Sequence, residues 1–184
     1  MEKEKYNRYD SPNSYNEDVL QSYDDTCAIK SQQIVLQSHG IDVSEDELRE
    51  EAMHNGWYFP GEGTPMADIG NLLVNYGIEA HKYVGATTHD LAEELLQGHQ
   101  VIVGVDSGEL WNKGIDETFE DIICGPQADH ALLVSGFAIN SITGSENILL
   151  TDPGTGEMFA NYPVEQFEDA WDDSGNYMVS VLDI

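Results

Sequence analysis

The sequence predicts an α+β protein with one main domain, in which helices come first along the chain and pack on a mostly antiparallel sheet. Amphipathic segments with clear helix starts and stops dominate the first half, whereas short apolar runs between turn clusters dominate the second half. The 184 residues, 40% of them hydrophobic, are enough to bury one core without the help of disulfides or metals.

Four helices are expected in the first half of the chain. The first begins near Cys27, has Asp25 or Thr26 as its N-cap and ends at Gly40. The second begins at Ser44, which can form a capping box with Glu47. The core-facing stripe of the first helix consists of Ala28, Ile29, Gln32, Val35, Leu36 and His39. The third and fourth helices are expected at residues 65–77 and at about 88–97.

Strand-like runs and turns alternate in the second half. The turn cluster NSITGS at residues 140–145 predicts that the strands on either side of it form a hairpin. Between two other strands, the acidic segment 107–128 is expected to form a lid or a short helix. The expected strands are 78–84, 100–106, 129–139, 146–152, 157–163 and 176–184, with a helix at 164–173. Residues 1–18 are expected to be a flexible polar arm, and residues 19–184 the single domain.

The charge of the chain excludes two classes of partner. Its 35 acidic and 7 basic side chains give a formal net charge of −28. Nucleic acids are excluded because phosphate binding requires lysine and arginine, and anionic membrane surfaces are excluded for the same reason. The acidity serves solubility or suits a salty habitat, or it favours a cationic peptide or protein as partner.

The sequence has no segment that targets a membrane. Its polar N-terminus lacks the apolar run of a Sec-type signal, and no window is long and apolar enough to span a bilayer. We therefore expect a cytoplasmic protein, or one exported by a route without a Sec-type signal. The two cysteines, Cys27 and Cys124, are far apart in the sequence and are expected to be free thiols rather than a disulfide.

Cys27 is a candidate nucleophile because it is expected in the first turn of a helix. Free N–H groups and the helix dipole stabilise a thiolate at that position. Taken alone, Cys27 also fits a small buried core residue. Asp24 and Asp25 would oppose a thiolate if they were close and ionised, so we expect them to point away, to cap the helix or to meet a cationic substrate.

His130 is the candidate base for this thiol, because it opens the apolar strand HALLVSG. In a hairpin about residues 140–145, position 130 lies opposite a position near 155. Asp152 is then at the same end of the sheet, where it can accept a hydrogen bond from His130 and orient the ring. The alternatives are that His130 is a satisfied core histidine and that Asp152 belongs only to an Asp-Pro-Gly turn.

Two groups near the helix start are candidates for an oxyanion hole. An acyl-transfer site needs hydrogen-bond donors for the negative oxygen that develops during the reaction. The backbone N–H of Cys27 offers one donor, and the side-chain amide of Gln21, six residues upstream, offers a second.

The order Gln21, Cys27, His130, Asp152 resembles that of the papain-like cysteine peptidases. It is more narrowly similar to the C39-like peptidases, the bacteriocin-processing domains that cut after a double glycine, and the similarity covers residues 20–182. The strand that carries the histidine, followed by a turn and the motif LTDPGTG, is the most specific feature. The resemblance implies a papain-like fold and amide hydrolysis through an acyl-enzyme, with no metal or other cofactor. Cys27 is then the nucleophile, His130 the base and later the acid, Asp152 the orienting group and Gln21 the oxyanion donor.

The sequence also differs from those processing domains and leaves other functions open. The 184 residues include no transporter segment, and Ala28 stands where those relatives often have glycine after the nucleophile. The same Cys-His-Asp machinery supports glutamine deamidation or acyl transfer, as in an effector that modifies a partner protein. A non-catalytic peptide-binding module is the remaining alternative. A peptide or protein is the expected partner in every case, and Cys124 is interpreted as a bystander thiol.

Overall fold

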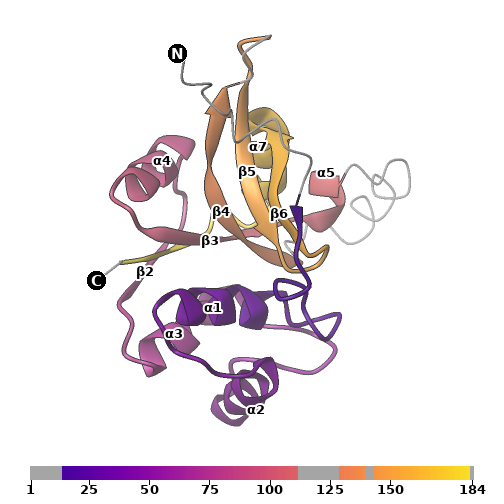
Figure 1. Ribbon diagram of the computed structural model, residues 1–184, viewed down its shortest axis with the longest axis vertical. Coiled ribbons are helices and arrows are strands. Elements are labelled where there is room, and N and C mark those ends of the chain that lie inside the picture. The colour runs from indigo at the N-terminus through magenta and orange to yellow at the C-terminus, as the bar shows by residue number, and fades with distance from the viewer. Residues whose placement is uncertain (1–13, 112–128, 140–142, 183–184) are drawn as a thin grey trace, which may run out of the picture.

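The computed structural model describes residues 14–111, 129–139 and 143–182, and it has two parts (Figure 1). Helices α1 (Cys27–Ser38), α2 (Glu45–Asn55) and α3 (Asn71–Asn75) lie together on one side of the molecule. The other part is a seven-stranded sheet together with α4 (Thr88–Leu96), α5 (Ser107–Trp111) and α7 (Val164–Asp172). This arrangement confirms the α+β class.

The sheet has the strand order β1-β6-β5-β4-β3-β7-β2, and every neighbouring pair is antiparallel. The hairpin predicted about residues 140–145 is present, and its register agrees with the expected one, with Leu133 opposite Thr151 and Phe137 opposite Ile148. The strands are β1 (Ser14–Tyr15), β2 (Ala80–Tyr83), β3 (Gln100–Val105), β4 (His130–Ile139), β5 (Glu146–Asp152), β6 (Glu157–Pro163) and β7 (Met178–Val181).

The central strands separate two hydrophobic cores. Because side chains alternate along a strand, Ile102 of β3 packs with α1, α2 and α3, whereas Val101 and Val103 pack on the other side. The second core is completed by α4, α5 and α7, which contribute Leu91, Leu110 and Trp171 among others.

Helix α1 is buried over most of its surface, not only along the predicted stripe. Its buried residues include the polar side chains of Lys30, Ser31, Gln32 and Gln33. Each of these has a partner, as buried polar groups require. Gln32 Oε1, for example, accepts from the backbone N–H groups of Gly70 and Leu72 at 2.9 and 3.2 Å. The helix is therefore fixed to its neighbours on several sides.

Two predicted elements differ from the structure. The helix expected over residues 65–77 is divided into the 3-10 turn η1 (Met66–Asp68) and α3, because Gly70 between them has a φ of +95°. The arm expected over residues 1–18 includes β1, which pairs with β6 and is therefore not a loose segment there. Within the described residues, no helix combines the length and the apolar character that crossing a bilayer would require.

Candidate active site

Cys27 is the first residue of α1, as the sequence predicted, and its thiol is free and partly exposed. Thr26 precedes it as the N-cap, and the side chain of Thr26 does not cap the helix. The N–H groups of the first turn have no acceptor within the helix, so they are available to a group bound near the thiol. The fold therefore places a thiol at the positive end of a buried helix.

His130 and Asp152 meet at the open end of the β4–β5 hairpin. His130 is the first residue of β4 and Asp152 the last residue of β5, so the antiparallel register brings them together. His130 Nε2 lies 2.6 Å from Asp152 Oδ1. Both residues are buried, with His130 7% and Asp152 0% exposed. A buried pair at this distance is a strong, charge-assisted hydrogen bond.

His130 is hydrogen-bonded to Cys27 as well as to Asp152. Because Nε2 faces Asp152, Nδ1 is the ring nitrogen that remains for the thiol. Burial alone would lower the pKa of His130, but the hydrogen bonds to Asp152 and Cys27 outweigh it and raise this pKa to about 10. The geometry therefore favours an imidazolium between a carboxylate and a sulfur atom.

Asp152 is held by donors on both of its carboxylate oxygens. Oδ1 accepts from His130 and from the backbone N–H of Gly154 at 2.8 Å, and Oδ2 accepts from the indole of Trp111 at 3.1 Å. Burial would raise the pKa of Asp152, but these hydrogen bonds and the charge of His130 lower it below its usual value. Asp152 therefore stays ionised while it orients the imidazole.

On the sequence alone, Trp111 is a candidate for the wall of a substrate cleft or an ordinary loop aromatic, and no contact with His130 or Asp152 is predicted for it. It ends α5, and its ring centroid lies 5.2 Å from that of His130, so it covers the His130–Asp152 pair. The signal in the sequence was weak, because a single aromatic residue at the edge of an acidic segment has many uses. Trp111 reaches the site because α5 follows β3, the strand paired with β4.

Gln21 lies beside the same turn, since its backbone N–H donates to Pro153 O at 2.9 Å. Its side-chain Nε2 donates to the carbonyl of Tyr23 at 2.7 Å. An amide nitrogen carries two donors, so this bond occupies one and leaves the second for another acceptor. The structure thus brings Gln21 close to the Asp152 turn, with its amide oriented by a backbone carbonyl.

The carboxylate of Asp25 is turned towards Tyr58 and Gly61 and away from Cys27, which is one of the arrangements expected for the acids that precede this cysteine. The carboxylate accepts from the Tyr58 hydroxyl at 2.7 Å and from the Gly61 N–H at 2.6 Å. Burial would raise the pKa of Asp25, but these two hydrogen bonds hold it below the usual value. Asp24, in contrast, is exposed and lines the cleft next to His130.

A cleft of about 450 Å³ lies beside the catalytic candidates. Its walls come from the segment before α1, from α5, from the start of β4 and from the turn after β5. They include Gln21, Asp24, Ser107, Trp111, Asp129 and His130. Asp129 accepts from the N–H and the hydroxyl of Ser107 at 2.9 and 3.0 Å, which fixes one acidic wall. Cys124 and residues 112–128 of the predicted lid lie outside the described residues.

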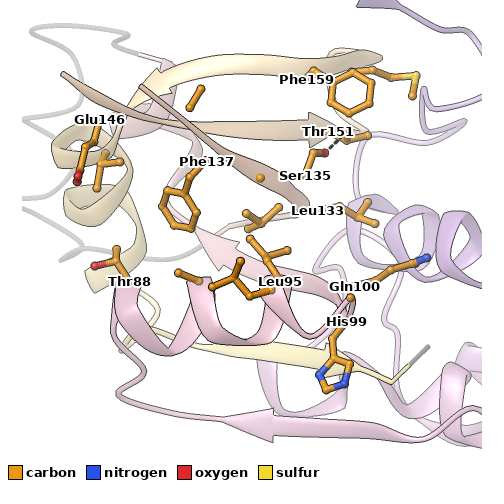
Figure 2. Close-up of a pocket in the computed structure, with 18 of the residues that line it drawn as sticks. Thr88, Leu95, His99, Gln100, Leu133, Ser135, Phe137, Glu146, Thr151 and Phe159 are labelled. Carbon is orange, nitrogen blue, oxygen red and sulfur yellow. Dashed lines mark hydrogen bonds between the residues drawn. The ribbon is translucent and has the colours of Figure 1, made fainter. Parts of the chain in front are cut away.

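A second, larger hollow of about 1060 Å³ lies between α4 and the face of the sheet formed by β4, β5 and β6 (Figure 2). Apolar side chains such as Leu95, Phe137 and Phe159 point into it. Ser135 and Thr151 form a hydrogen bond of 2.8 Å at its floor. Val19 lines this groove and Leu20 lines the cleft, so the groove approaches the cleft along the segment before α1.

Three solved structures with the same fold are described as a peptidase or a peptidase domain. A protein of Bacillus anthracis assigned to the C39-like peptidases has a TM-score of 0.65 at 16% identity, covering 95% of this chain and 99% of that chain. The peptidase domain of Streptococcus ComA, a bifunctional ABC transporter of a quorum-sensing pathway, has a TM-score of 0.61 at 18% identity, with coverages of 89% and 94%. A double-glycine-motif protease from an AMS/PCAT transporter, solved with a leader peptide, has a TM-score of 0.55 at 16% identity, with coverages of 94% and 93%.

Sequence comparisons identify the family to which the chain belongs. Uncharacterized proteins of Mycobacterium tuberculosis and Mycobacterium bovis are 29% identical to this chain over 183 residues, which covers 86% of this chain and 77% of the relatives. The sequence model of the Peptidase_C39 like family matches residues 6–179, nearly the whole chain. With its papain-like arrangement of helices and sheet, this chain belongs to the C39-like peptidase family.

Proposed function

We propose that this protein is a cysteine peptidase that hydrolyses a peptide bond through a Cys27 acyl-enzyme. The observation that carries the proposal is the position of His130, which is hydrogen-bonded to Cys27 on one side and to Asp152 on the other. A nucleophile, a base within hydrogen-bond reach and a third group that orients the base are what covalent catalysis requires.

The proposed reaction begins with attack of the Cys27 sulfur on the carbonyl carbon of the substrate. A C–S bond forms, and the carbonyl electron pair moves to oxygen, where the Cys27 N–H and the Gln21 amide would hold the negative charge. The C–N bond then breaks while His130 gives its proton to the leaving amine. Water, deprotonated by His130, next attacks the thioester and releases the carboxylic acid and the thiolate. Asp152 keeps the imidazole oriented throughout.

The substrate we propose is a peptide whose scissile bond lies in the cleft and whose flanking segment lies in the apolar groove. The solved relative bound to a leader peptide supports a peptide substrate. The groove offers apolar surface of the kind that binds an amphipathic or extended segment. Asp24 and Asp129 in the cleft wall and the overall charge of −28 favour a substrate with basic side chains near the cut.

Thiol reactivity tests the catalytic assignment. Limiting iodoacetamide at mildly acidic pH is expected to alkylate Cys27 much faster than Cys124, because the protonated imidazole of His130 stabilises the Cys27 thiolate. In His130→Ala this preference is expected to disappear. Peptide mapping by mass spectrometry gives both rates in one sample, so Cys124 serves as the internal control. Equal and slow labelling of the two thiols would overturn the catalytic assignment.

The products of the reaction separate peptidase activity from the alternatives. Incubation with a library of basic peptides is expected to give two fragments per cleaved peptide, and Cys27→Ala is expected to give none. Conversion of glutamine to glutamate in an intact peptide would instead show a deamidase. Tight binding without any turnover by the wild-type protein would show a peptide-binding module.

A further inference from the structure

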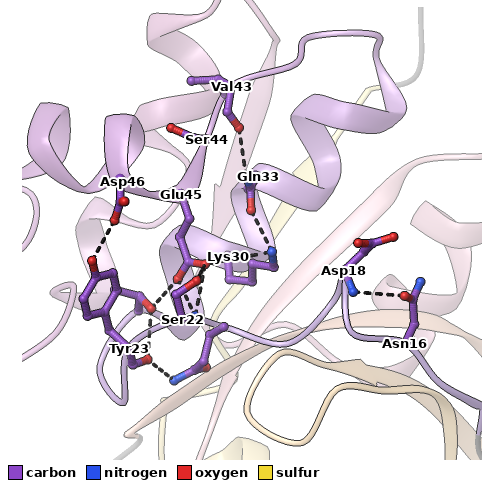
Figure 3. Close-up of polar contacts among 12 residues, drawn as sticks. Asn16, Asp18, Ser22, Tyr23, Lys30, Gln33, Val43, Ser44, Glu45 and Asp46 are labelled. Carbon is purple, nitrogen blue, oxygen red and sulfur yellow. Dashed lines mark hydrogen bonds and ion pairs between the residues drawn. The ribbon is translucent and has the colours of Figure 1, made fainter.

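The five residues between Gln21 and Cys27 are held in place by a carboxylate from another helix. Glu45 is the first residue of α2, follows the N-cap Ser44, and is only 6% exposed. Figure 3 shows its side chain pointing from α2 towards the turn that contains Ser22 and Tyr23. Because the turn lies directly before the proposed nucleophile, its conformation bears on the site.

Glu45 makes contacts at both ends of this turn. At the start, the Ser22 backbone N–H lies 3.1 Å from each carboxylate oxygen, and the Ser22 hydroxyl donates to Oε2 at 2.8 Å. At the end, the Thr26 hydroxyl lies 2.6 Å from Oε1. Lys30 Nζ, itself almost buried, lies 3.9 Å from Oε2. A carboxylate accepts several donors at once, so it can join these groups where no single neutral side chain would.

The residue between the two contact points, Tyr23, is the one that orients the Gln21 amide. The carbonyl of Tyr23 accepts from Gln21 Nε2 at 2.7 Å and is approached by the Thr26 N–H at 3.4 Å. Glu45 contacts the Ser22 N–H and the Thr26 hydroxyl, and this hydroxyl also lies 3.0 Å from the Tyr23 carbonyl oxygen. The direction of the carbonyl therefore depends on groups that Glu45 holds. A displacement of the turn would therefore be transmitted to the amide of Gln21.

Other contacts hold Glu45 itself in position. Lys30 donates to Gln33 Oε1 at 2.9 Å, and Gln33 Nε2 donates to Val43 O at 2.8 Å, just before α2 begins (Figure 3). The capping box of Ser44 and Glu47 fixes the first turn of α2. The carboxylate of Glu45 thus projects from a rigid helix end, and its negative charge is balanced by a cation on α1.

We propose that Glu45 is a positioning residue for the oxyanion hole: it holds the Ser22–Thr26 turn so that the Tyr23 carbonyl aims the Gln21 amide at the oxygen that becomes negative. The inference rests on the proposed function, because it gives Gln21 and Cys27 their roles. Glu45 does not touch the reacting atoms, and it acts through the turn that both residues share.

Two probes separate this role from a general effect on the thiol. Iodoacetamide alkylates a thiolate without forming an oxyanion, whereas a peptide aldehyde adds to Cys27 to form a C–S bond and an oxygen that needs the oxyanion hole. The test variant is Glu45→Gln, which has nearly the same shape. Its NH2 group accepts no hydrogen bond. The remaining oxygen can still accept from the Ser22 N–H, but the hydroxyl of either Ser22 or Thr26 loses its acceptor, so the turn is held less firmly. The matched control is Glu50→Gln, the same change at an exposed position of the same helix.

We expect Glu45→Gln to bind the aldehyde about 10²-fold more weakly than Glu50→Gln, the loss that a displacement of about 1 Å can cause. The alkylation rate of Cys27 is expected to be the same in the two variants. Ser22→Ala, at an exposed position that leaves α2 intact, is expected to weaken aldehyde binding to a smaller extent.

Two results would overturn the inference. Equal aldehyde affinities of Glu45→Gln and Glu50→Gln would show that the turn does not need Glu45. A parallel fall of aldehyde affinity and alkylation rate in Glu45→Gln would show that Glu45 acts only on the fold. A wild-type protein that neither alkylates preferentially at Cys27 nor binds the aldehyde would instead overturn the proposed function, and this result is distinguishable from the other two.

Discussion

The indole Nε1 of Trp111 donates a hydrogen bond to Oδ2 of Asp152 at 3.1 Å, while the Trp111 ring lies 5.2 Å from the ring of His130. One side chain therefore satisfies the carboxylate oxygen that His130 does not use and also covers the hydrogen bond between the two residues. Removal of water from such a pair strengthens it. The hydrogen bond from the indole N–H and the shielding by the ring can be tested separately, because phenylalanine keeps an aromatic ring and lacks the N–H.

Trp111→Phe is expected to shift the acidic limb of the kcat/KM profile to higher pH. The hydrogen bond from Trp111 helps to lower the pKa of Asp152, so its loss raises that pKa and the carboxylate protonates earlier on acidification. The direction of the shift follows because a hydrogen bond stabilises the charged form of the carboxylate and its loss favours the protonated form. The pH–rate profile checks this, with Trp57→Phe outside the cleft as control. An acidic limb at the same pH in Trp111→Phe and the wild type would show that Trp111 acts only by shielding the His130–Asp152 pair from water.

Gly154→Ala is expected to lower kcat/KM about 10²-fold by displacing the imidazole. A Cβ atom at position 154 would lie 3.0 Å from His130 Cε1 and 3.2 Å from Asp152 Oδ1. Gly144→Ala is the control for stability. It has a φ of +73° and no atom within 4 Å of the added methyl group, so it is strained without touching the site. It is expected to lose about 1 kcal/mol of stability and to keep its activity. Equal activities of the two variants would contradict the prediction.

The stability of the protein is expected to depend on His130 between about pH 6.5 and pH 10. The folded state raises the pKa of this residue from 6.5 to about 10. Protonated His130 therefore stabilises the native state fully below the lower value, and this contribution is lost as the pH rises through the upper value. Urea unfolding across this range measures it. Over this pH range, the free energy of unfolding of His130→Gln is expected to fall less than that of the wild type. An equal fall in the two proteins would disprove the assignment to His130.

Phe159→Asn is expected to raise KM about tenfold without a change in kcat, because it removes apolar surface that binds substrate before and during the reaction. Phe159 lines the groove, is 49% exposed and has a φ of +58°, a conformation that asparagine tolerates. The variant should therefore fold normally. Val84→Asn, at a position 76% exposed and outside the groove, is the control. A fall in kcat with KM unchanged would place Phe159 in the chemistry instead.

Local signals in the sequence predicted most of the elements. Gly40 ends α1 with a φ of +76°, and Ser44 with Glu47 forms the capping box that begins α2. The turn cluster at 140–145 predicted the register of β4 and β5, and this register brings His130 and Asp152 together. In each case the information lies within a few neighbouring residues or in one hairpin, where spacing determines geometry.

The features that the sequence did not predict depend on contacts between distant segments. Trp111 reaches Asp152 only because α5 follows the strand next to β4. Glu45 reaches Ser22 and Thr26 only through the packing of α2 against the segment before α1. The break at Gly70 was hidden because a glycine within an apolar periodic segment is compatible with a continuous helix. No local pattern identifies partners of this kind.

The division of the proposed catalytic residues between the two parts of the fold has a consequence during synthesis of the chain. Cys27 leaves the ribosome early, on a helix that can pack with α2 and α3, whereas His130 and Asp152 follow only when β4 and β5 are made. These strands are internal in the sheet, so the pair forms after β3 and β6 are also available. A nascent chain would therefore carry a thiol without its base. The proposed peptidase would therefore be inert towards its own unfinished chain and towards neighbouring nascent proteins until the sheet is complete.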